Sequence, residues 1–559
     1  MCGIFGCVGK NAYIKVLEGL KLLQYRGYDS CGIAYFENGF KTEKSVGPLE
    51  NLKLIDTKSQ IAFGHTRWAT NGEVNYLNAH PHVSYNKEIY VVHNGIIKNA
   101  DTIKEKLTKE NILFYSNTDT EVIANLISYQ SNLNGLENAL KNLFSVLEGS
   151  FSLIVGTKNG NLYLIKKFSP LNVLISDNEI YISSDETSLK NGKLYKLKDN
   201  DIIKISNKKI TKLNDKNLTF TNHENSLKSL SLNKHQHFMH KEIFETPTAI
   251  EETYNEIKDL DVYSTLNQFS KITLIGCGTA YHSCLIGAYW LKRDLKKSVE
   301  TYLASNYEIS EQISKNHLHI IVSQSGETAD CIRVAEEIKK HNGKILVITN
   351  QNKSTIANMA DLHIFTHAKK EIAVASTKTY CCQLFVFAYI CKKLQNPDYD
   401  LNIKSLSENL KNYLKILNIK AIAEQLKDVN RMILIAKDID YITILEASLK
   451  IREIDYIFTL PMYSGELKHG TLSLVDENCY VITLNSDTNS NKLQNAVNEI
   501  KSRKGNIIDF SQIVKANVDE YFKPIFAIIP FQLLSYQISV INGRNPDMPR
   551  NLAKSVTVE

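Results

Sequence analysis

The second residue of the chain is a cysteine, Cys2, which lies between the initiator methionine and Gly3. Met1 is normally removed before such a small-residue context, which leaves a thiol and a free α-amine on one residue. An α-amine has a pKa of about 7.7–8, so at neutral pH part of it is an unprotonated base beside the sulfur. A thiol with its own base is an activated nucleophile. Most cysteines are structural, so Cys2 alone does not decide between the two interpretations.

Three later segments carry groups that suit a small zwitterion beside this thiol. Arg67 in GHTRWATNGE can hold a carboxylate through two parallel hydrogen bonds. Asn94 and Gly95 in VVHNGIIKN lie at the end of an expected strand, where a side-chain amide and a backbone N–H stabilise an oxyanion. Asp119 in SNTDTEV can hold an α-ammonium group. These groups describe a site for an amino acid whose far carbonyl is attacked by a thiolate, and glutamine hydrolysis meets each demand.

Six motifs occur in order and together resemble the glutaminase domain of class II amidotransferases: MCGIFG, YRGYDSCGIA, GHTRWAT, NAHPHV, HNGIIKN and TDTEV. The resemblance covers about the first 210 residues and implies an N-terminal-nucleophile hydrolase fold, an α+β arrangement of stacked β-sheets between helices. The roles that it implies are nucleophile and base for Cys2, oxyanion hole for Asn94 and Gly95, and glutamine binding for Arg67, Thr70 and Asp119.

Two nearby residues are less certain parts of this resemblance. Trp68 resembles the aromatic gate to an ammonia channel, and the alternative is plain packing in the core. Asn71 stands where relatives often have histidine, which leaves the role of that side chain open.

A second group of candidate residues lies in IIVSQSGETAD, where an expected strand ends in residues 323–328 at a helix start. Hydroxyls and free backbone N–H groups at a helix N-terminus form an anion site that a phosphate fits. Small polar turns also serve merely as helix caps. The three hydroxyls clustered around Gly326 favour phosphate. The G-x-x-x-x-G-K-[ST] motif of nucleoside triphosphate sites is absent from the sequence.

Residues suited to aldose–ketose chemistry follow. KIREIDY places Lys450 and Glu453 on one helical face, as proton transfer between neighbouring sugar carbons requires, although the same spacing is common in surface ion pairs. His469 in SGELKHG carries an imidazole, a group that can accept and donate a proton, and can therefore open a sugar ring. Lys554, near the C-terminus, can form a Schiff base with a ketone if its amine is desolvated.

The segments IGCGTAYHS, SQSGETAD, EIAVASTKTY, SLKIREIDY, SGELKHG and PRNLAKSVTVE resemble the paired sugar isomerase domains of the isomerising glutamine–fructose-6-phosphate aminotransferases. This family converts glutamine and fructose 6-phosphate to glucosamine 6-phosphate, without a cofactor. The residues expected to bind the sugar phosphate are Thr279, Ser323, Gln324, Ser325 and Thr328, with Val374, Ser376 and Ala553 lining the sugar site. The catalytic roles implied are Schiff base for Lys554, proton transfer for Glu453, assistance for Lys450, and ring opening for His469.

The resemblance also implies an assembly of subunits, and the sequence departs from the family pattern at one position of the phosphate site. His469 is expected to come from the neighbouring subunit, which implies a homodimer at least. Ala280 follows Thr279 where relatives have serine, so one hydroxyl at the phosphate is missing.

The elements that must position these residues divide the chain into parts. Residues 1 to about 215 read mainly as strands with two helical stretches, and the expected strands include QIAFGHTRWAT, KEIYVVHNGII and SFSLIVGT. From about residue 270 strands and helices alternate in two α/β units of similar size. The expected elements there include the strands KITLIGCG and HIIVSQSGET and the helix ITILEASLKIREIDYIF. We expect a glutaminase domain over residues 2–215 and a linker over 216–238. Sugar isomerase domains with parallel sheets, forming three layers, are expected over 239–400 and 401–547, followed by an active-site tail over 548–559 that must pack on something.

Composition narrows the remaining possibilities. The chain has 559 residues, 43% of them hydrophobic and 23% charged, as in a soluble globular protein of several domains. A net charge of +6 spread along a Lys-rich chain does not indicate nucleic acid. Ten cysteines without C-x-x-C spacing predict reduced thiols in the cytoplasm, and the pairs His80/His82 and His317/His319 lack partners for a metal site. Two apolar runs, TYCCQLFVFAYICKKL and YFKPIFAIIPFQLLSYQISVI, are expected to be buried helices and not membrane spans.

Two alternative functions remain from the sequence. Another class II amidotransferase would carry an S-G-G-x-D-S pyrophosphate loop or an acidic ribose-binding strand end, and neither is seen. A sugar-phosphate sensor with inactive isomerase domains would lack Glu453 and Lys554 and usually carries a helix-turn-helix for DNA.

Overall fold

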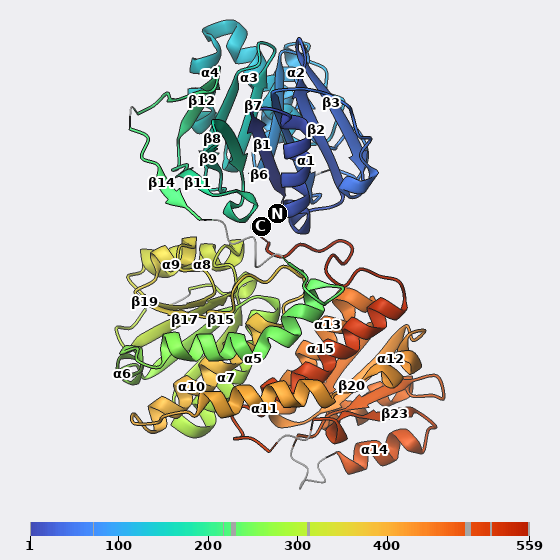
Figure 1. Cartoon of the computed structure of the whole chain (residues 1–559). Helices are drawn as coiled ribbons and strands as arrows, with labels where there is room; N and C mark the ends of the chain where they lie inside the picture. Colours follow the sequence, from blue (N-terminus) through green and yellow to red (C-terminus); the bar gives the residue numbers. More distant parts are fainter. Residues whose placement is uncertain are drawn as a thin grey trace. The chain divides into compact units, whose positions relative to one another are not determined.

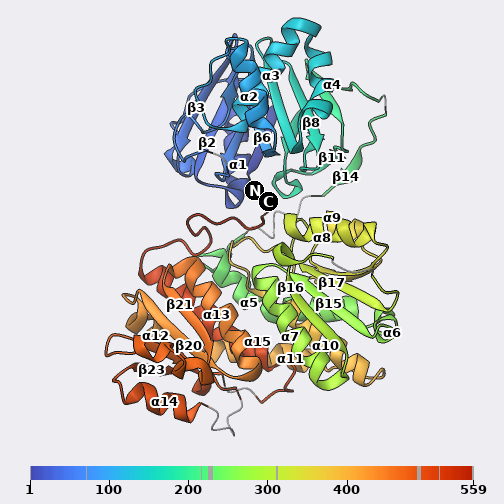
Figure 2. The same ribbon diagram turned by 180° about the vertical axis from the view of Figure 1, so that it is seen from behind.

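The computed structural model describes residues 2–70, 72–215, 217–224, 231–309, 313–486, 493–514 and 517–556. The chain forms two compact units, one ending at Ser231 and the other beginning at Leu232 (Figures 1 and 2). Each unit has its own sheets and cores and is described by itself below.

The amino-terminal unit contains two antiparallel sheets, with strand orders β14-β11-β9-β10-β1-β4-β2-β3 and β13-β12-β8-β7-β6-β5. The strands of the first sheet are β1 (Gly3–Val8), β2 (Ser30–Phe36), β3 (Phe40–Val46), β4 (Ile61–Arg67), β9 (Asn172–Ser176), β10 (Glu179–Ser183), β11 (Gly192–Lys196) and β14 (Thr221–His223). Those of the second are β5 (His82–Val83), β6 (Ile89–Ile97), β7 (Gly149–Thr157), β8 (Leu162–Lys167), β12 (Ile202–Ser206) and β13 (Lys209–Lys212). The helices are α1 (Ala12–Leu23), α2 (Ala100–Lys109), α3 (Asp119–Asn134) and α4 (Leu136–Val146).

Alternation of side chains along the strands builds this unit in layers. On β1, Ile4 and Val8 point into a core shared with the second sheet, where Ile154 meets them. Phe5 and Cys7, one residue out of phase, face a separate core against α1. A third core lies between the second sheet and helices α2, α3 and α4. The order of layers is therefore helix, sheet, sheet, helices, and the strands β4, β6 and β7 predicted from the sequence are confirmed.

The segment 216–238, expected as a linker, contributes one strand to the first sheet. Residues Thr221–His223 form β14 and pair with β11, with His223 opposite Gly192. An edge strand bonds to a single neighbour, and this one leaves its side chains largely exposed. A short polar sequence can therefore form it, which is why neither hydrophobicity nor periodicity indicated a strand there.

The carboxy-terminal unit contains two parallel sheets, with strand orders β16-β15-β17-β18-β19 and β21-β20-β22-β23. The strands are β15 (Lys271–Gly276), β16 (Ser298–Leu303), β17 (His317–Ser323), β18 (Lys344–Thr349), β19 (Leu362–Phe365), β20 (Arg431–Ala436), β21 (Phe458–Tyr463), β22 (Tyr480–Thr483) and β23 (Asn506–Asp509). Four strands follow the same order in both sheets, as expected for an internal duplication.

The helices of this unit are α5 (Phe238–Ile257), α6 (Val262–Asn267), α7 (Gly278–Leu295), α8 (Ala329–Lys340), α9 (Thr355–Met359), α10 (Lys378–Gln395), α11 (Ile403–Ile416), α12 (Lys420–Leu426), α13 (Asp438–Asp455), α14 (Gln494–Lys501) and α15 (Lys523–Ile541). Helix α13 starts before the run ITILEASLKIREIDYIF and ends at Asp455, before the run does. Tyr456 takes a left-handed conformation with φ of 57° and ends the helix, and Phe458 begins β21.

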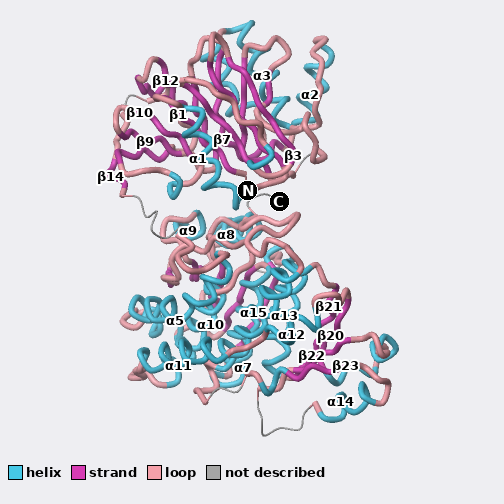
Figure 3. Tube along the Cα trace, turned by 45° about the vertical axis from the view of Figure 1, so that its right-hand side comes forward, coloured by secondary structure: helices cyan, strands magenta, loops and turns pink. Residues whose placement is uncertain are grey.

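One large core joins both sheets of the carboxy-terminal unit. Helices α7, α10, α13 and α15 pack on one another between the sheets (Figures 1 and 3). Both apolar runs from the sequence are buried helices of this core, α10 and α15. Within the described residues, α15 alone is long and apolar enough to cross a membrane, and 83% of its apolar window is buried inside the unit.

Candidate active sites

Cys2 lies beside the end of β4 in the amino-terminal unit. The pairing of Gly3 with Thr66 brings Cys2 next to Arg67 and Trp68, and the backbone N–H of Trp68 donates a hydrogen bond to the Cys2 Sγ at 3.3 Å. Burial raises the pKa of the Cys2 thiol, and the charge of the chain's amino terminus, the Trp68 N–H and Arg67 oppose that rise. A thiol in these surroundings is protonated at neutral pH, so an adjacent base must take its proton before it can attack.

Asn94, on β6, is oriented toward the backbone of Cys2. Its Nδ2 donates to the Cys2 carbonyl at 3.0 Å, and its Oδ1 lies 3.1 Å from the Nε2 of His65. The Nε2 of His65 also lies 3.0 Å from the His93 carbonyl, so it must carry the hydrogen. Burial lowers the pKa of His65 to about 3, which keeps the ring neutral. His65 therefore fixes which way the Asn94 amide points.

Gly95 occupies a position that only glycine can fill. Its φ is +132°, and an added Cβ would lie 1.9 Å from the carbonyl oxygen of Ser150 on the paired strand β7. The chain can therefore take this twisted conformation next to Asn94 within a continuous sheet. A side-chain amide and a glycine N–H at consecutive positions are the donors expected of an oxyanion hole.

Asp119 opens helix α3 and is held ready to accept a cation. Its Oδ2 accepts the N–H of Ile97 at 3.0 Å, and its Oδ1 lies 3.7 Å from the Nδ1 of His93. Burial raises the pKa of a carboxyl, but His93 and the bonds from Ile97 and Thr120 hold the pKa of Asp119 below its usual range. Arg67, buried at 3% exposure, is within electrostatic reach of both Cys2 and Asp119. The Arg67 cation thus lies near both the thiol and the Asp119 carboxylate.

Backbone carbonyls hold Arg67, whereas Thr70 and Trp68 are more exposed. Arg67 donates to the carbonyls of Gly72 and Glu73 at 3.1 and 3.3 Å. Thr70 is exposed, and Trp68 is only partly buried, so Trp68 does not pack as a plain core residue. Asn71 lies outside the described residues.

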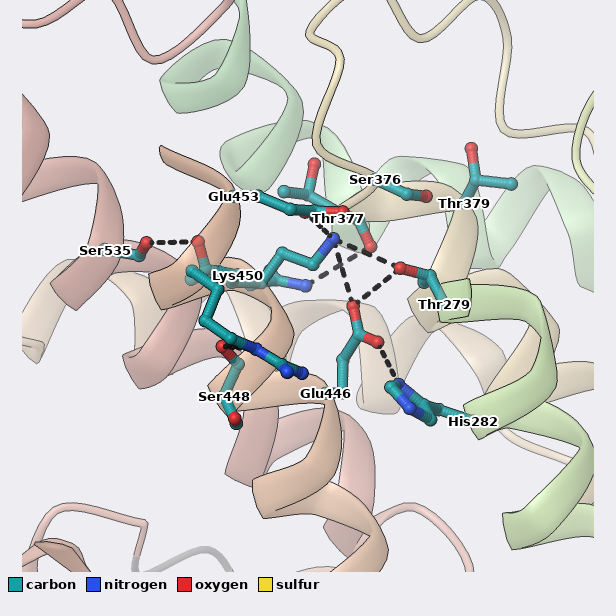
Figure 4. A network of polar contacts seen from close by, with 12 residues as sticks. Thr279, His282, Ser376, Thr377, Thr379, Glu446, Ser448, Lys450, Glu453 and Ser535 are labelled. Atoms are coloured by element: carbon teal, nitrogen blue, oxygen red, sulfur yellow. Dashed lines mark hydrogen bonds and ion pairs between the residues drawn. The ribbon is translucent and has the colours of Figure 1, made fainter. Parts of the chain in front are cut away.

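The candidate sugar site contains a buried charge network centred on Lys450 (Figure 4). Lys450 is fully buried, and its Nζ lies 2.5 Å from Glu453, 3.3 Å from Glu446 and 3.1 Å from the hydroxyl of Thr279. Glu446 also bonds Thr279 at 3.0 Å and the Nδ1 of His282 at 2.6 Å. Lys450 and Glu453 are therefore not the surface ion pair that the sequence left as an alternative.

Spacing along α13 explains how the network forms. Glu446, Lys450 and Glu453 are four and three residues apart, so they share the helix face that packs on α7. Burial lowers the pKa of an amine, but the two carboxylates raise the pKa of Lys450 above its usual value. Burial raises the pKa of a carboxyl, but Lys450 and His282 hold the pKa of Glu446 below its usual range. Glu453 keeps 21% of its side chain exposed, so it is the member of the group that a ligand can reach.

The turn at residues 323–328 links β17 to α8, as predicted. The hydroxyls of Ser323 and Thr328 are 3.0 Å apart, and Ser323 accepts the N–H of Gly326 at 3.1 Å. Gly326 has φ of +62°, and a Cβ there would lie 2.0 Å from the Ser354 hydroxyl, so the tight turn depends on glycine. Thr279 follows the neighbouring parallel strand β15, so both segments lie at the same edge of the sheet.

The C-terminal tail packs on this edge, as expected. The Ser555 hydroxyl lies 3.0 Å from that of Ser325, and the Val556 carbonyl accepts the N–H of Ala329 at 3.1 Å. Lys554, with 8% of its side chain exposed, places its Nζ 2.6 Å from the Oε2 of Glu371. The amine of the tail lysine is thus largely desolvated and paired with one buried carboxylate.

Glu371 organises the loop that carries two further predicted residues. It accepts the hydroxyl of Ser376 at 3.0 Å and the N–H groups of Thr377 and Thr379 at 2.9 and 3.1 Å. Burial raises the pKa of a carboxyl, but Lys554 and these donors lower the pKa of Glu371 to about 2. Val374 is buried in the same loop.

Three predicted residues remain less constrained. Gln324 and Ala553 are partly exposed. His469 is exposed in its own chain, and within the described residues the structure does not join it to Lys450, Glu453 or Lys554.

Several residues of both sites were not predicted from the sequence. The predicted residues are held by five such partners: His65, His93, Glu371, Glu446 and His282. His65, His93, Glu371 and His282 lie inside motifs that carry the resemblance, but nothing in their spacing indicated which residue each would meet.

The histidines considered for a metal have other partners. His82 contacts Thr118 at 3.0 Å, and His317 contacts Thr273 at 2.7 Å. Across the described ranges, no group of three or more His, Cys, Asp or Glu side chains is arranged to hold a metal ion.

Comparison with known proteins places both units. Residues 65–191 match the model of the glutamine amidotransferase domain, and residues 265–391 and 425–529 match that of the SIS domain. The C-terminal domain of glucosamine-fructose-6-phosphate aminotransferase from Francisella tularensis superimposes with a TM-score of 0.51 at 30% identity, covering 57% of this chain and 100% of that chain.

Two full-length relatives extend the match to the whole chain. The proteins from Pyrococcus horikoshii and Wigglesworthia glossinidia brevipalpis are 36% and 37% identical to it, with 100% of each chain covered. Both are named glutamine–fructose-6-phosphate aminotransferase [isomerizing]. This chain belongs to the isomerising glutamine–fructose-6-phosphate aminotransferase family.

Proposed function

We propose that this protein hydrolyses glutamine and uses the ammonia to convert fructose 6-phosphate to glucosamine 6-phosphate, the first step of amino-sugar synthesis. The overall reaction yields glutamate and glucosamine 6-phosphate and needs neither an oxidant nor a nucleotide. The buried pairing of Lys554 with Glu371 carries the proposal, because it holds the one tail residue suited to Schiff-base chemistry against the loop of Val374 and Ser376, which we propose to line the sugar site. A sensor without catalysis would have no use for this pair.

The amino-terminal unit is proposed to hydrolyse glutamine as an N-terminal-nucleophile hydrolase. After loss of Met1, the α-amine of Cys2 takes the thiol proton, and the thiolate attacks the side-chain amide of glutamine. Asn94 and Gly95 donate to the oxyanion that develops; because Nδ2 has two hydrogens, one can hold Cys2 while the other faces the oxyanion. Arg67 and Asp119 bind the substrate's carboxylate and ammonium, with Thr70 completing the site.

The carboxy-terminal unit is proposed to hold the sugar by its phosphate. Thr279 and the 323–328 turn supply hydroxyls and N–H groups, with the amide of Gln324, and the N-terminus of α8 adds a favourable dipole. The loss of a serine at Ala280 leaves these donors in place. Val374, Ser376 and Ala553 line the sugar chain. This arrangement would place the open-chain ketone within reach of Lys554.

The chemical steps on the sugar are assigned from the charged and basic side chains of the site. The Lys554 amine condenses with the C2 ketone to form a Schiff base and releases water. Ammonia then adds to this carbon and expels the lysine amine, which leaves the imine of the sugar. Glu453 takes a proton from C1 and returns one to C2, which gives the amino sugar. Lys450 steadies the developing negative charge, as its buried position between two carboxylates suggests. His469 opens the sugar ring, and because it is exposed in its own chain we assign it to the site of a partner subunit in a homodimer.

Ammonia is proposed to pass from one site to the other without release to water, where it would be diluted and largely protonated. Trp68 is the proposed gate, because its side chain is partly exposed and its backbone N–H bonds the Cys2 Sγ, which keeps the residue beside the thiol. All ten cysteines are free thiols, which suits the reducing cytoplasm. The proposed domains are a glutaminase domain over residues 2–215 and sugar isomerase domains over 239–400 and 401–547. Residues 216–238 are the proposed linker, and residues 548–559 are the proposed tail.

The decisive experiment is formation of glucosamine 6-phosphate by the purified protein from glutamine and fructose 6-phosphate. The assay contains a chelator and no added nucleotide. Product with one glutamate released per amino sugar supports the proposal. Glutamate release without amino sugar would leave a glutaminase only and overturn it.

A further inference from the structure

Two cysteine sulfurs are in contact at the sheet edge that carries the proposed phosphate site. Cys277 follows β15 and Cys331 lies in the first turn of α8, and their Sγ atoms are 4.0 Å apart, where one thiol hydrogen-bonds the other. Cys331 is 0% exposed in the apolar core between α8 and the sheet. The ten cysteines all lie in described segments, and among them Cys2 and Cys277 are partly exposed while the others are buried. Cys277 is therefore an accessible thiol in contact with a buried one.

The surroundings of the pair favour loss of the proton from Cys277. A hydrogen bond from the Cys331 S–H lowers the pKa of the Cys277 thiol, and the N–H of Ala304 and the charge of Arg333 also lower it, against burial and Asp330. The same hydrogen bond, together with burial, raises the pKa of Cys331 well above its usual value. A partly exposed thiol with a lowered pKa beside a second thiol is typical of cysteine pairs that are oxidised to a disulfide.

Cys277 also begins the helix that carries Thr279. Its carbonyl accepts the N–H groups of Ala280 and Tyr281 at 3.1 and 3.4 Å, so Cys277 caps the first turn of α7. A disulfide bond is about 2 Å long, so the two sulfurs, now 4.0 Å apart, must approach each other by about 2 Å. Because Cys331 is held in a packed core, much of this shift must fall on Cys277 and on the turn that it caps.

Thr279 makes its contacts from that turn. Its hydroxyl donates to the Oε1 of Glu446 at 3.0 Å and accepts from the Nζ of Lys450 at 3.1 Å. A displacement of about 1 Å in a group that positions a substrate can lower the rate by about 100-fold. A bond between the two sulfurs would therefore disturb a proposed phosphate donor and its link to the buried charge network.

We propose that Cys277 and Cys331 are a modification site at which a peroxide forms a reversible disulfide, and that this bond inactivates the sugar site. The Cys277 thiolate attacks one peroxide oxygen and the O–O bond breaks, which leaves a sulfenic acid and a hydroxide that is protonated to water. The Cys331 thiol then attacks the Cys277 sulfur, the S–S bond forms, the S–O bond breaks, and a second water leaves. The two thiols lose two electrons, which reduce one hydrogen peroxide.

A dithiol reductant returns the pair to two thiols by exchange. In a reducing cytoplasm the disulfide is transient, as is usual for redox-sensing cysteine pairs. Formation of the bond depends only on the two cysteines. Its effect on the sugar rests on the proposed function, because Thr279 is assigned there to the phosphate.

The test uses full-length protein carrying Cys2→Ala as the parent, so that oxidation of the glutaminase thiol does not enter. The reduced parent is treated briefly with hydrogen peroxide, quenched and divided between two measurements. Peptide mapping by mass without reductant identifies the bonded cysteines, and isomerisation of fructose 6-phosphate to glucose 6-phosphate reports on the sugar site. Part of each sample then receives dithiothreitol. Cys331→Ala removes the buried partner, and Cys284→Ala, which removes another buried cysteine of α7, is the matched control.

The oxidised parent should yield one peptide pair joined through Cys277 and Cys331 and should isomerise fructose 6-phosphate about 10–100-fold more slowly, with the rate restored by dithiothreitol. Cys284→Ala should behave as the parent does. Cys331→Ala should form no such pair and should keep its rate, because nothing draws the turn toward α8. A reversible loss in Cys331→Ala as large as that of the parent overturns the inference.

The parent alone decides the matter if Cys331→Ala fails to fold. A peptide map in which Cys277 and Cys331 are never joined overturns the modification site. A joined pair with an unchanged isomerisation rate overturns its control of the sugar site. A reduced parent that does not isomerise fructose 6-phosphate at all instead refutes the proposed function, and the peptide map still reports on the disulfide, so the failures can be told apart.

Discussion

Replacement of Asn94 by alanine separates catalysis from stability in the glutaminase site. The change removes the Nδ2 donor that lies 3.0 Å from the Cys2 carbonyl. Loss of one oxyanion donor costs about 10²–10³ in kcat, or about 2.7–4 kcal/mol. His65 loses its contact with Oδ1 but keeps the His93 carbonyl at 3.0 Å, so no buried N–H is left unpaired. The free energy of unfolding should therefore fall by only about 1 kcal/mol, the value of the bond to Cys2.

The assay is glutamate release in the presence of fructose 6-phosphate. We expect kcat to fall about 100–1000-fold while KM for glutamine changes less than about threefold, because the interaction is made in the transition state. Asn94→Asp keeps an oxygen toward His65 but loses the donor, so it should be equally impaired. Fructose 6-phosphate isomerisation by the same samples reports an intact fold. A kcat loss below about tenfold, or a loss that appears mainly in KM, would refute this account of Asn94.

Four further outcomes test the two sites. Cys2→Ala should abolish glutamine use and leave sugar isomerisation intact; glutamine-dependent synthesis by this variant would refute the nucleophile assignment. Lys554→Ala should stop amino-sugar formation while some glutamine hydrolysis persists, and unchanged synthesis would remove the lysine from the mechanism. Lys450→Met leaves the fully buried Glu446 without its lysine, so urea unfolding should show a loss of about 3–5 kcal/mol, and a change below about 1 kcal/mol would contradict a buried pair. Intact mass of the active protein should lack Met1, and a fully active chain that retains it would exclude the α-amine as base.

Much of the fold follows from local pattern. Strand-then-turn signals such as KITLIGCG and HIIVSQSGET predicted β15 and β17, since parallel strands buried on both faces read as apolar runs that end in polar turns. β-rich runs bounded by turn residues predicted β4, β6 and β7. The edge strand β14 was missed because its pairing with β11 depends on backbone groups and not on apolar side chains. The start of β21 was taken for helix, because the helical pattern of α13 runs into it without a glycine or proline.

The residues of the candidate sites also divide into those with a local signal in the sequence and those without one. Lys450 and Glu453 were predicted because their spacing is local, within one helix. Glu446 was not singled out, although it is only four residues from Lys450, since its importance comes from Thr279 and His282 on α7. Glu371 could not be linked to Lys554, which lies 183 positions away along the chain. Partners brought together by tertiary packing leave no periodic signal in a single sequence.

The position of α15 has a consequence for how the chain is made. This helix, Lys523–Ile541, lies near the C-terminus yet supplies the centre of the core that joins both parallel sheets. During synthesis the amino-terminal unit can complete its own cores while α15 is still inside the ribosome. The carboxy-terminal unit must then wait with apolar helices such as α10 unprotected, which makes it the part of the nascent protein most dependent on chaperones.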